Sequence, residues 1–335
     1  MLKPASGPLC GARLAALLGT LGTGAAFAQG ATLDHPVQPI DVITAMESHG
    51  IHAGHRRNHA KGLCVAGEFK PTREAAALSA SNIFAGAPVP VVGRFSNPGP
   101  DPASPDNAVM PRGFALQFQP KNGATSNMSM LNVPVFPVPD PEGFYTLLTL
   151  ASDQMPAFQA KYPRSLPFFQ FLGKSGVPVS YATTDYHSLS AFKFTNAKGG
   201  AAFVRWNFVS QQGDHYLTPD AAKAKSPGFL SDALQAELAK GPVRWKMQAV
   251  LAQGSDSLVD PSMTWTGPHK TVPLGTLTIT QADTDDKGGC NGINFDPNNV
   301  AAGIEPSDDP VLKFRSPAYA ISYGKRLGEK AQAPN

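Results

Sequence analysis

The sequence predicts an α+β domain whose core is a curled antiparallel sheet or barrel. Apolar residues recur at every second position in several segments, for example at Val204, Trp206 and Phe208, which is typical of strands with one buried face. Segments with helical spacing lie between these strands. Glycine and proline contribute 32 residues each to a chain of 335, which favours many turns over long helices. No repeat or linker divides the chain, so residues 29–335 are expected to form a single domain.

Five segments carry the strand pattern, because their apolar side chains alternate with polar ones and would line one face of a sheet. Strands of this kind favour an antiparallel arrangement that curls on itself. The segments are Phe114, Leu116 and Phe118; Phe192 and Phe194; Val204, Trp206 and Phe208; residues 243–251; and Gly275, Leu277 and Ile279.

Five other segments are interpreted as helices from their apolar spacing, capping residues and breakers. The first is expected to be capped by Asp41, and the second to bury Leu78 and Ile83 and to stop at Gly86. Pro219 suits the first turn of the fourth. The helical segments are residues 41–47, 72–84, 144–159, the stretch that begins at Thr218, and residues 231–240.

Residues 1–28 have the order of a secretory signal peptide. Lys3 and Arg13 precede an apolar stretch over residues 14–26, which ends in small residues at Ala26-Phe27-Ala28. That stretch is shorter than the roughly 20 residues that a membrane span needs, and no later segment approaches this length. We therefore expect cleavage after Ala28, a periplasmic or secreted product, and no membrane partner.

The charge argues against a nucleic-acid-binding protein, and the few cysteines allow at most one disulfide in the mature chain. The formal charge of +3 falls towards neutrality once the signal segment leaves, and no concentrated basic run is present, so a nucleic-acid partner is not expected. Cys10 lies in the signal segment. Cys64 and Cys290 could form one disulfide in an oxidising compartment, but two isolated thiols fit the sequence equally well.

Half of the eight histidines lie within eleven residues, at His49, His52, His55 and His59. Such density could describe a surface metal site. Two glycines interrupt the helix that would align these side chains, and no cysteine or acidic residue joins them at ligand spacing. A solvated histidine-rich loop is the simpler alternative.

A series of short motifs runs from about residue 40 to the C-terminus. The first motif, Arg-x-x-His-Ala-Lys-Gly, contains His59, and the last ends in Arg315 and Tyr319. The intervening motifs are Arg94-Phe95-Ser96, Pro111-Arg112-Gly113-Phe114-Ala115, Pro134-Val135-Phe136, Pro268-His269-Lys270, Phe295-Asp296-Pro297-Asn298-Asn299 and Gly303-Ile304-Glu305-Pro306-Ser307. An Arg-x-x-x-Tyr pair alone is common in helices, but behind Gly-Ile-Glu-Pro-Ser it becomes specific. In this order the motifs resemble the catalase family, and the resemblance implies a catalase-like antiparallel barrel with surrounding short helices.

The resemblance implies a haem pocket with His59 as the distal acid–base residue. Ser96 takes the position of the hydroxyl that orients the imidazole, because a ring that accepts a proton on one nitrogen needs the other nitrogen fixed. Arg56 and Arg94 would bind the haem propionates, since a guanidinium matches a carboxylate with two hydrogen bonds. Asn58 stands where the family often has valine, and this polar change could alter peroxide access. The motif at residues 111–115 is interpreted as a turn that enters a strand.

The implied cofactor is haem b, with Tyr319 as the axial ligand of the iron. A free phenol has a pKa of about 10, and only its anion is a good iron ligand. Arg315, one helical turn earlier on the same face, would stabilise that anion. Phe136 and Phe144 match aromatic positions that flank or cover the haem, although both could be ordinary core residues.

One position departs from the family pattern. Leu131 takes the place of the distal asparagine when the chain is aligned on Pro134-Val135-Phe136. Asn132 follows one residue later, where a strand would direct its side chain to the other face. Either a bulge brings Asn132 into the pocket, or His59 alone holds the peroxide.

The resemblance therefore implies a haem peroxidase that reduces hydrogen peroxide and organic hydroperoxides with a small organic electron donor. Leu131 lacks a hydrogen-bond donor, and this loss should harm disproportionation more than the first reaction with peroxide. The short continuation after Tyr319 is expected to leave the haem edge open to a donor. Alternatives are a weak true catalase, a non-catalytic haem carrier or sensor, and a hydroperoxide isomerase. We expect a monomer or a homodimer.

Overall fold

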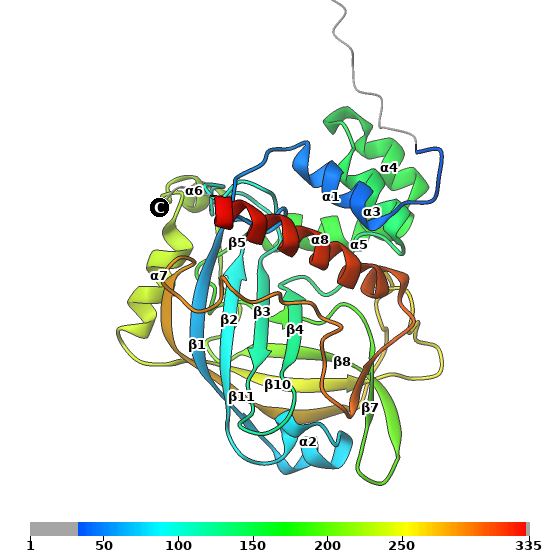
Figure 1. Cartoon of the computed structure of the whole chain (residues 1–335), viewed down its shortest axis with the longest axis vertical. Coiled ribbons are helices and arrows are strands. Elements are labelled where there is room, and N and C mark those ends of the chain that lie inside the picture. Colours follow the sequence, from blue (N-terminus) through cyan, green and yellow to red (C-terminus); the bar gives the residue numbers. More distant parts are fainter. Residues whose placement is uncertain (1–32, 333–335) are drawn as a thin grey trace, which may run out of the picture.

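The computed structural model describes residues 33–332, so the expected signal peptide at residues 1–28 lies outside the described residues. Eight strands form a closed antiparallel barrel in the order β10-β11-β1-β2-β3-β4-β6-β8, and β8 pairs with β10 to close it (Figure 1). The predicted fold class, an α+β domain with an antiparallel barrel core, is confirmed. The barrel strands are β1 (Gly62–Pro71), β2 (Val89–Ser96), β3 (Gly113–Phe118), β4 (Ser126–Leu131), β6 (Tyr186–His187), β8 (Ala201–Ser210), β10 (Val243–Leu251) and β11 (Thr271–Thr284).

Aromatic side chains pack in the core of the barrel, as the alternating pattern predicts. Phe95 of β2 stacks on Phe114 of β3 and on Tyr181, with ring centroids 4.1 and 4.7 Å apart. Trp245 reaches the same cluster from β10, and all four side chains are buried. Burial of each ring contributes on the order of 1.5–3 kcal/mol relative to leaving it exposed. The contact of Trp245 with Phe95 joins β10 to β2, which are not neighbours in the sheet, so it helps to hold the barrel wall in place.

Short strands extend the structure beyond the barrel. β7 (Phe192–Thr195) pairs with β8, and β12 (Ile304–Pro306) pairs with β7. β5 (Val177–Pro178) and β9 (Tyr216–Leu217) form a separate two-stranded sheet. Only three residues separate β12 from α8, so the pairing of β12 with β7 fixes the point from which that helix starts.

The longest helix, α8, crosses the outside of the barrel, and α1 and α3 pack against it (Figure 1). Buried Arg57 ties these parts together, because its guanidinium pairs with Glu47 of α1 and with Glu329 of α8. Lys325 of α8 also pairs with Glu47, at 2.7 Å. The helices are α1 (Pro39–Glu47), α2 (Arg73–Leu78), α3 (Pro141–Leu148), α4 (Met155–Lys161), α5 (Leu166–Ser175), α6 (Pro219–Lys223), α7 (Phe229–Leu238) and α8 (Pro310–Gln332).

Several predicted helix boundaries were wrong. Asp41 is not the residue that precedes α1; it lies in the first turn, and its carboxylate accepts a hydrogen bond from the backbone N–H of Gln38. The predicted helix over residues 72–84 ends at Leu78 and resumes as a single turn that buries Ile83. The predicted helix over residues 144–159 is two helices, α3 and α4, and the one over residues 231–240 begins at Phe229. Thr218 caps α6 before Pro219, as predicted.

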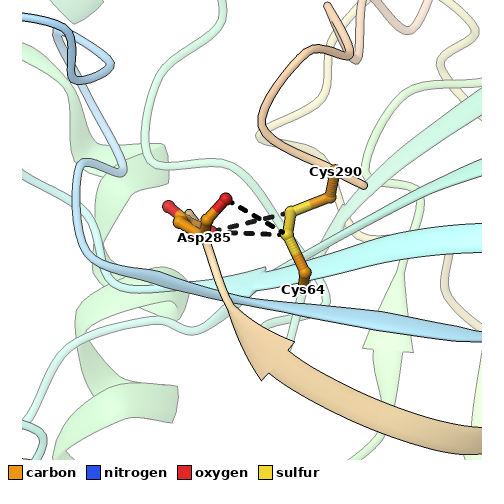
Figure 2. Close-up of side chains that lie close together, drawn as sticks. All are labelled: Cys64, Asp285 and Cys290. Atoms are coloured by element: carbon orange, nitrogen blue, oxygen red, sulfur yellow. Dashed lines mark hydrogen bonds between the residues drawn. A yellow bond between two sulfur atoms is a disulfide. The ribbon is translucent and has the colours of Figure 1, made fainter. Parts of the chain in front are cut away.

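A disulfide links Cys64 of β1 to Cys290, with their Cα atoms 5.4 Å apart. The carboxylate of Asp285 lies beside the two sulfur atoms (Figure 2). Of the two alternatives that the sequence left open, the structure has the paired one. The bond fastens the loop that follows β11 to the strand that begins three residues after His59.

No helix within residues 33–332 combines the length and apolar character needed to cross a bilayer.

Candidate functional site

A cavity of about 630 Å³ lies between the barrel wall of β2, β3 and β4 and the helices α1, α3 and α8. Its volume falls in the range of roughly 300–1,000 Å³ that is usual for ligand sites. All eight residues that the sequence placed at the site line this one cavity. They are Arg56, His59, Arg94, Ser96, Phe136, Phe144, Arg315 and Tyr319.

His59 occupies a strained turn just before β1. Its φ angle is +57°, in the left-handed region that a residue with a Cβ enters at a cost of roughly 1–2 kcal/mol. The Nδ1 atom of its imidazole lies 2.9 Å from the hydroxyl of Ser96, at the end of β2. This contact fixes one ring nitrogen and leaves Nε2 available to a ligand in the cavity.

Gly113 makes room for the imidazole, which is a role that the sequence analysis missed. A Cβ atom at this position would lie 2.5 Å from the hydroxyl of Ser96 and 3.0 Å from Nδ1 of His59. Any larger residue would therefore displace the ring or break its hydrogen bond. The motif at residues 111–115 was interpreted only as a turn entering a strand, although the glycine within it was the available signal.

Burial and three arginines keep His59 neutral. Packing around the ring lowers its pKa to about 3, and the positive charges of Arg94, Arg315 and Arg56 act in the same direction. As a residue, His59 is half-buried, and it lines the cavity. A neutral imidazole can accept a proton throughout the ordinary pH range.

Arg315 and Tyr319 lie one turn apart on α8 and face the same cavity. The guanidinium of Arg315 donates a hydrogen bond of 2.5 Å to the hydroxyl of Tyr319, and it also lies over the phenol ring at 5.1 Å from the centroid. The guanidinium therefore places a positive charge directly beside the phenol oxygen. Such a pair is suited to binding a cation or a metal through the phenolate oxygen.

The side chain of Asn298 holds the part of α8 that carries Arg315 and Tyr319. The amide of Asn298 donates to the carbonyl of Leu312 at 2.7 Å and to the hydroxyl of Ser316 at 2.9 Å. Ser316 in turn donates to Asp296 at 3.0 Å. Pro317 lies inside the helix and lacks an N–H group, so these side-chain contacts support a turn that has fewer backbone hydrogen bonds.

Two arginines at the edge of the cavity have no carboxylate partner within the described part of the chain. Arg56 donates only to the carbonyls of Cys290 and Ile293, and Arg326 donates only to the side chain of Asn291. Burial lowers the pKa of both guanidinium groups, because removal from water disfavours the charged form. A bound acid would supply the missing charge.

Arg94, unlike Arg56 and Arg326, pairs with a carboxylate. Its Nε and Nη2 atoms donate to Asp285 at 2.9 and 2.5 Å, and its remaining donors reach the carbonyls of His59 and Ala60. Arg326 and Asp285 were missed by the sequence analysis. Arg326 lies seven residues after Tyr319, two helical turns along the same face, and this spacing was the signal that could have identified it.

Leu131 faces the cavity, whereas Asn132 does not line it. The pairing of β3 with β4 runs without a bulge up to Gly113 and Leu131. The side-chain oxygen of Asn132 accepts the backbone N–H of Arg112 at 2.6 Å, so this amide is occupied inside the protein. A bulge that would bring Asn132 into the cavity is therefore excluded.

Phe136 and Phe144 form part of the apolar wall, with ring centroids 5.5 Å apart. The other histidines of the N-terminal group do not join His59 in a metal site. In the part of the chain that the structure describes, the one group of three potential ligands is Cys64, Asp285 and Cys290, whose sulfur atoms are bonded to each other.

Together, the closed barrel and the helices define a barrel protein with a ligand-sized cavity between its wall and a covering helix. The cavity offers a neutral histidine, a phenol paired with a guanidinium, and unpaired arginines at one edge.

The catalase family profile matches residues 24–333. A catalase-related peroxidase of Synechococcus elongatus is 42% identical over 301 residues, which are 87% of this chain and 89% of that relative. A second catalase-related peroxidase, from Mycolicibacterium paratuberculosis, is 39% identical and covers 89% of this chain and 97% of its own length. The chain therefore belongs to the catalase family.

Solved structures share the fold at lower identity. Catalase A from Saccharomyces cerevisiae superposes with a TM-score of 0.76 at 23% identity, covering 86% of this chain and 64% of the yeast chain. A fungal catalase gives a TM-score of 0.74 at 22% identity. This chain spans about two thirds of these larger proteins.

Proposed function

We propose that the protein is a haem b peroxidase that reduces hydrogen peroxide and organic hydroperoxides with a small organic electron donor. The observation that carries the proposal is that His59 and the Arg315–Tyr319 pair line one cavity. Membership of the catalase family, with two relatives named catalase-related peroxidase, supports an oxidoreductase that acts on peroxide.

The residues around the cavity suit a haem. Tyr319 would bind the iron through its phenolate oxygen, and Arg315 would stabilise that anion. The propionates would meet Arg56 and Arg326, whose charges lack partners, while Arg94 would contribute from beside Asp285. The apolar wall suits the porphyrin faces. Bound haem would supply the redox chemistry.

The protein's own part in the reaction would be proton transfer at His59. With its proton on Nδ1 and Ser96 as the acceptor, Nε2 of His59 would take a proton from the near oxygen of a peroxide and return it to the far oxygen. The far oxygen would then leave as water or as an alcohol. The two electrons that cleave the O–O bond would come from bound haem, and the organic donor would return them. The low pKa of His59 keeps Nε2 unprotonated before the peroxide arrives.

Leu131 supports peroxidase chemistry over efficient disproportionation. An apolar side chain at this point of the wall cannot donate a hydrogen bond to a second hydrogen peroxide. It also makes the wall more compatible with the alkyl group of an organic hydroperoxide. A weak true catalase is the second candidate function, and oxygen evolution distinguishes the two.

The compartment and assembly belong to the same proposal. A periplasmic or secreted location agrees with the disulfide between Cys64 and Cys290, because such bonds persist in oxidising compartments. We propose a monomer or a homodimer with no nucleic-acid or membrane partner.

The test is turnover by purified, haem-supplemented protein. Wild type should oxidise a chromogenic donor with hydrogen peroxide and with cumene hydroperoxide, and should release little oxygen from hydrogen peroxide alone. His59→Ala should lose most donor oxidation while it keeps its haem. Vigorous oxygen release would favour a catalase, and full turnover by His59→Ala would contradict the role of this residue.

A further inference from the structure

His59 needs external support to keep its backbone conformation. Outside glycine, the described residues contain only two with a positive φ angle, His59 and Leu189. Left-handed backbone is disfavoured for a residue with a side chain, so it persists where neighbouring groups hold it. The conformation matters because it directs the imidazole towards Ser96 and the cavity.

The side chain of Asn58 supplies one such support. Its Oδ1 atom accepts the backbone N–H of His59 at 2.9 Å and also the backbone N–H of Gly99 at 2.6 Å. The N–H of Ala60 donates to the carbonyl of Gly99 at 3.0 Å. One amide oxygen thus joins the turn at His59 to the loop that follows β2.

The carbonyl side of the same residue is also fixed. Arg94 donates to the carbonyl of His59 at 2.8 Å and to that of Ala60 at 3.0 Å, and Asp285 fixes the guanidinium. The left-handed residue is therefore held through its N–H by Asn58 and through its C=O by Arg94. Arg94 is also a candidate for binding a haem propionate, whereas Asn58 lines the cavity with no such role assigned to it.

We propose that Asn58 is a positioning residue for His59, and that its side-chain oxygen holds the turn that aims the imidazole at peroxide. The inference deepens the proposed function and rests on it. A valine or leucine at this position has no acceptor and would leave two backbone N–H groups without this partner. An aspartate keeps an acceptor oxygen at the same distance from the backbone.

The test compares Asn58→Leu, which removes the acceptor, with Asn58→Asp, which keeps it. Asn122→Leu serves as the matched control, because Asn122 is an exposed residue in the loop between β3 and β4. Hydrogen–deuterium exchange is measured on peptides that contain His59 and Gly99, with and without haem. This readout reports the turn directly and does not depend on turnover.

In Asn58→Leu, both peptides should exchange about 5–10-fold faster, because each N–H has lost its acceptor. The rate of the first reaction with hydrogen peroxide, measured by stopped flow, should fall roughly 10- to 100-fold, since a slight misplacement of a catalytic group is costly. The KM for the reducing donor and the position of the Soret band should stay as in wild type. Asn58→Asp should restore most of the exchange protection and of the rate.

Equal loss in Asn58→Asp and Asn58→Leu would overturn the proposal, and so would wild-type exchange in Asn58→Leu. If leucine prevents folding, Asn58→Ala makes the same comparison without added bulk. A wild-type protein that binds no haem would refute the proposed function, while the exchange measurements on that protein would still decide the role of Asn58.

Discussion

His59 is the residue whose protonation state the structure specifies most clearly. Its low pKa has a simple cause, since burial and three neighbouring arginines all oppose a positive charge on the ring. The polar groups around it are arranged for a neutral base, with Ser96 on one nitrogen and open cavity beyond the ring.

The lowered pKa of His59 determines how the first reaction with peroxide should depend on pH. A histidine with the usual pKa of about 6.5 would lose its function as a base when the pH falls below neutrality. Because the pKa of His59 is lowered to about 3, the neutral form persists, and the rate should stay flat from pH 8 to about pH 4 and fall only below that. Stopped-flow mixing with brief pH jumps measures this profile. A decline centred near pH 6.5 would contradict the assignment.

Arg326 should matter for retention of the cofactor. It is 3% exposed and has no carboxylate partner among residues 33–332, so a haem propionate would be its natural counter-ion. In Arg326→Gln, haem should transfer to apomyoglobin at least about tenfold faster, as expected for the loss of one charged hydrogen bond. Lys330→Gln, an exposed change on the same helix, is the control. Equal transfer rates in Arg326→Gln and wild type would show that Arg326 does not hold the haem.

Among the elements, the loop over residues 285–293 links the disulfide to the site. Asp285 of this loop forms an ion pair with Arg94. The carbonyls of Cys290 and Ile293 accept hydrogen bonds from Arg56, and the side chain of Asn291 accepts one from Arg326. The bond between Cys64 and Cys290 anchors this loop to β1 (Figure 2). Three arginines of the cavity therefore depend on one fastened loop.

Removal of this bond should destabilise the protein. The cysteines are 226 residues apart, and a cross-link over a long loop typically contributes about 2–4 kcal/mol. The Cys64→Ser/Cys290→Ser double variant should therefore have a Tm lower by about 5–10 °C in differential scanning calorimetry. Dithiothreitol should lower the Tm of wild type and leave the double variant unchanged. Equal Tm values for the two proteins would show that the bond contributes little.

The sequence predicted the strands well and the helix boundaries poorly. Alternation in segments such as residues 243–251 marks a barrel strand directly, because one face must be buried. The segment from residue 144 to 159 looks continuous by apolar spacing, yet α3 ends at Leu148 and α4 begins at Met155. Pro156 lies in the first turn of α4, a position that suits proline, so a local signal for this boundary was present and was overlooked.

For the whole molecule, the eight candidate residues could be found from the sequence because short motifs kept their order along the chain. All of them reach one cavity, although His59 and Tyr319 are far apart in sequence. Gly113 and Arg326 had sequence signals that were overlooked, but Asp285 and the double hydrogen bond of Asn58 could not be assigned from the sequence. Their roles depend on which segments the closed barrel brings together, and this is a property of topology.

The central claim is that Tyr319 binds a haem iron in the cavity that His59 also lines. It is tested most directly by the ferric absorption and resonance Raman spectra of haem-loaded wild type and of Tyr319→Phe. Wild type should show iron–phenolate vibrations, and Tyr319→Phe should lose them and shift its Soret band while the barrel remains folded by circular dichroism. Identical spectra for the two proteins, or a wild type that takes up no haem, would contradict the account.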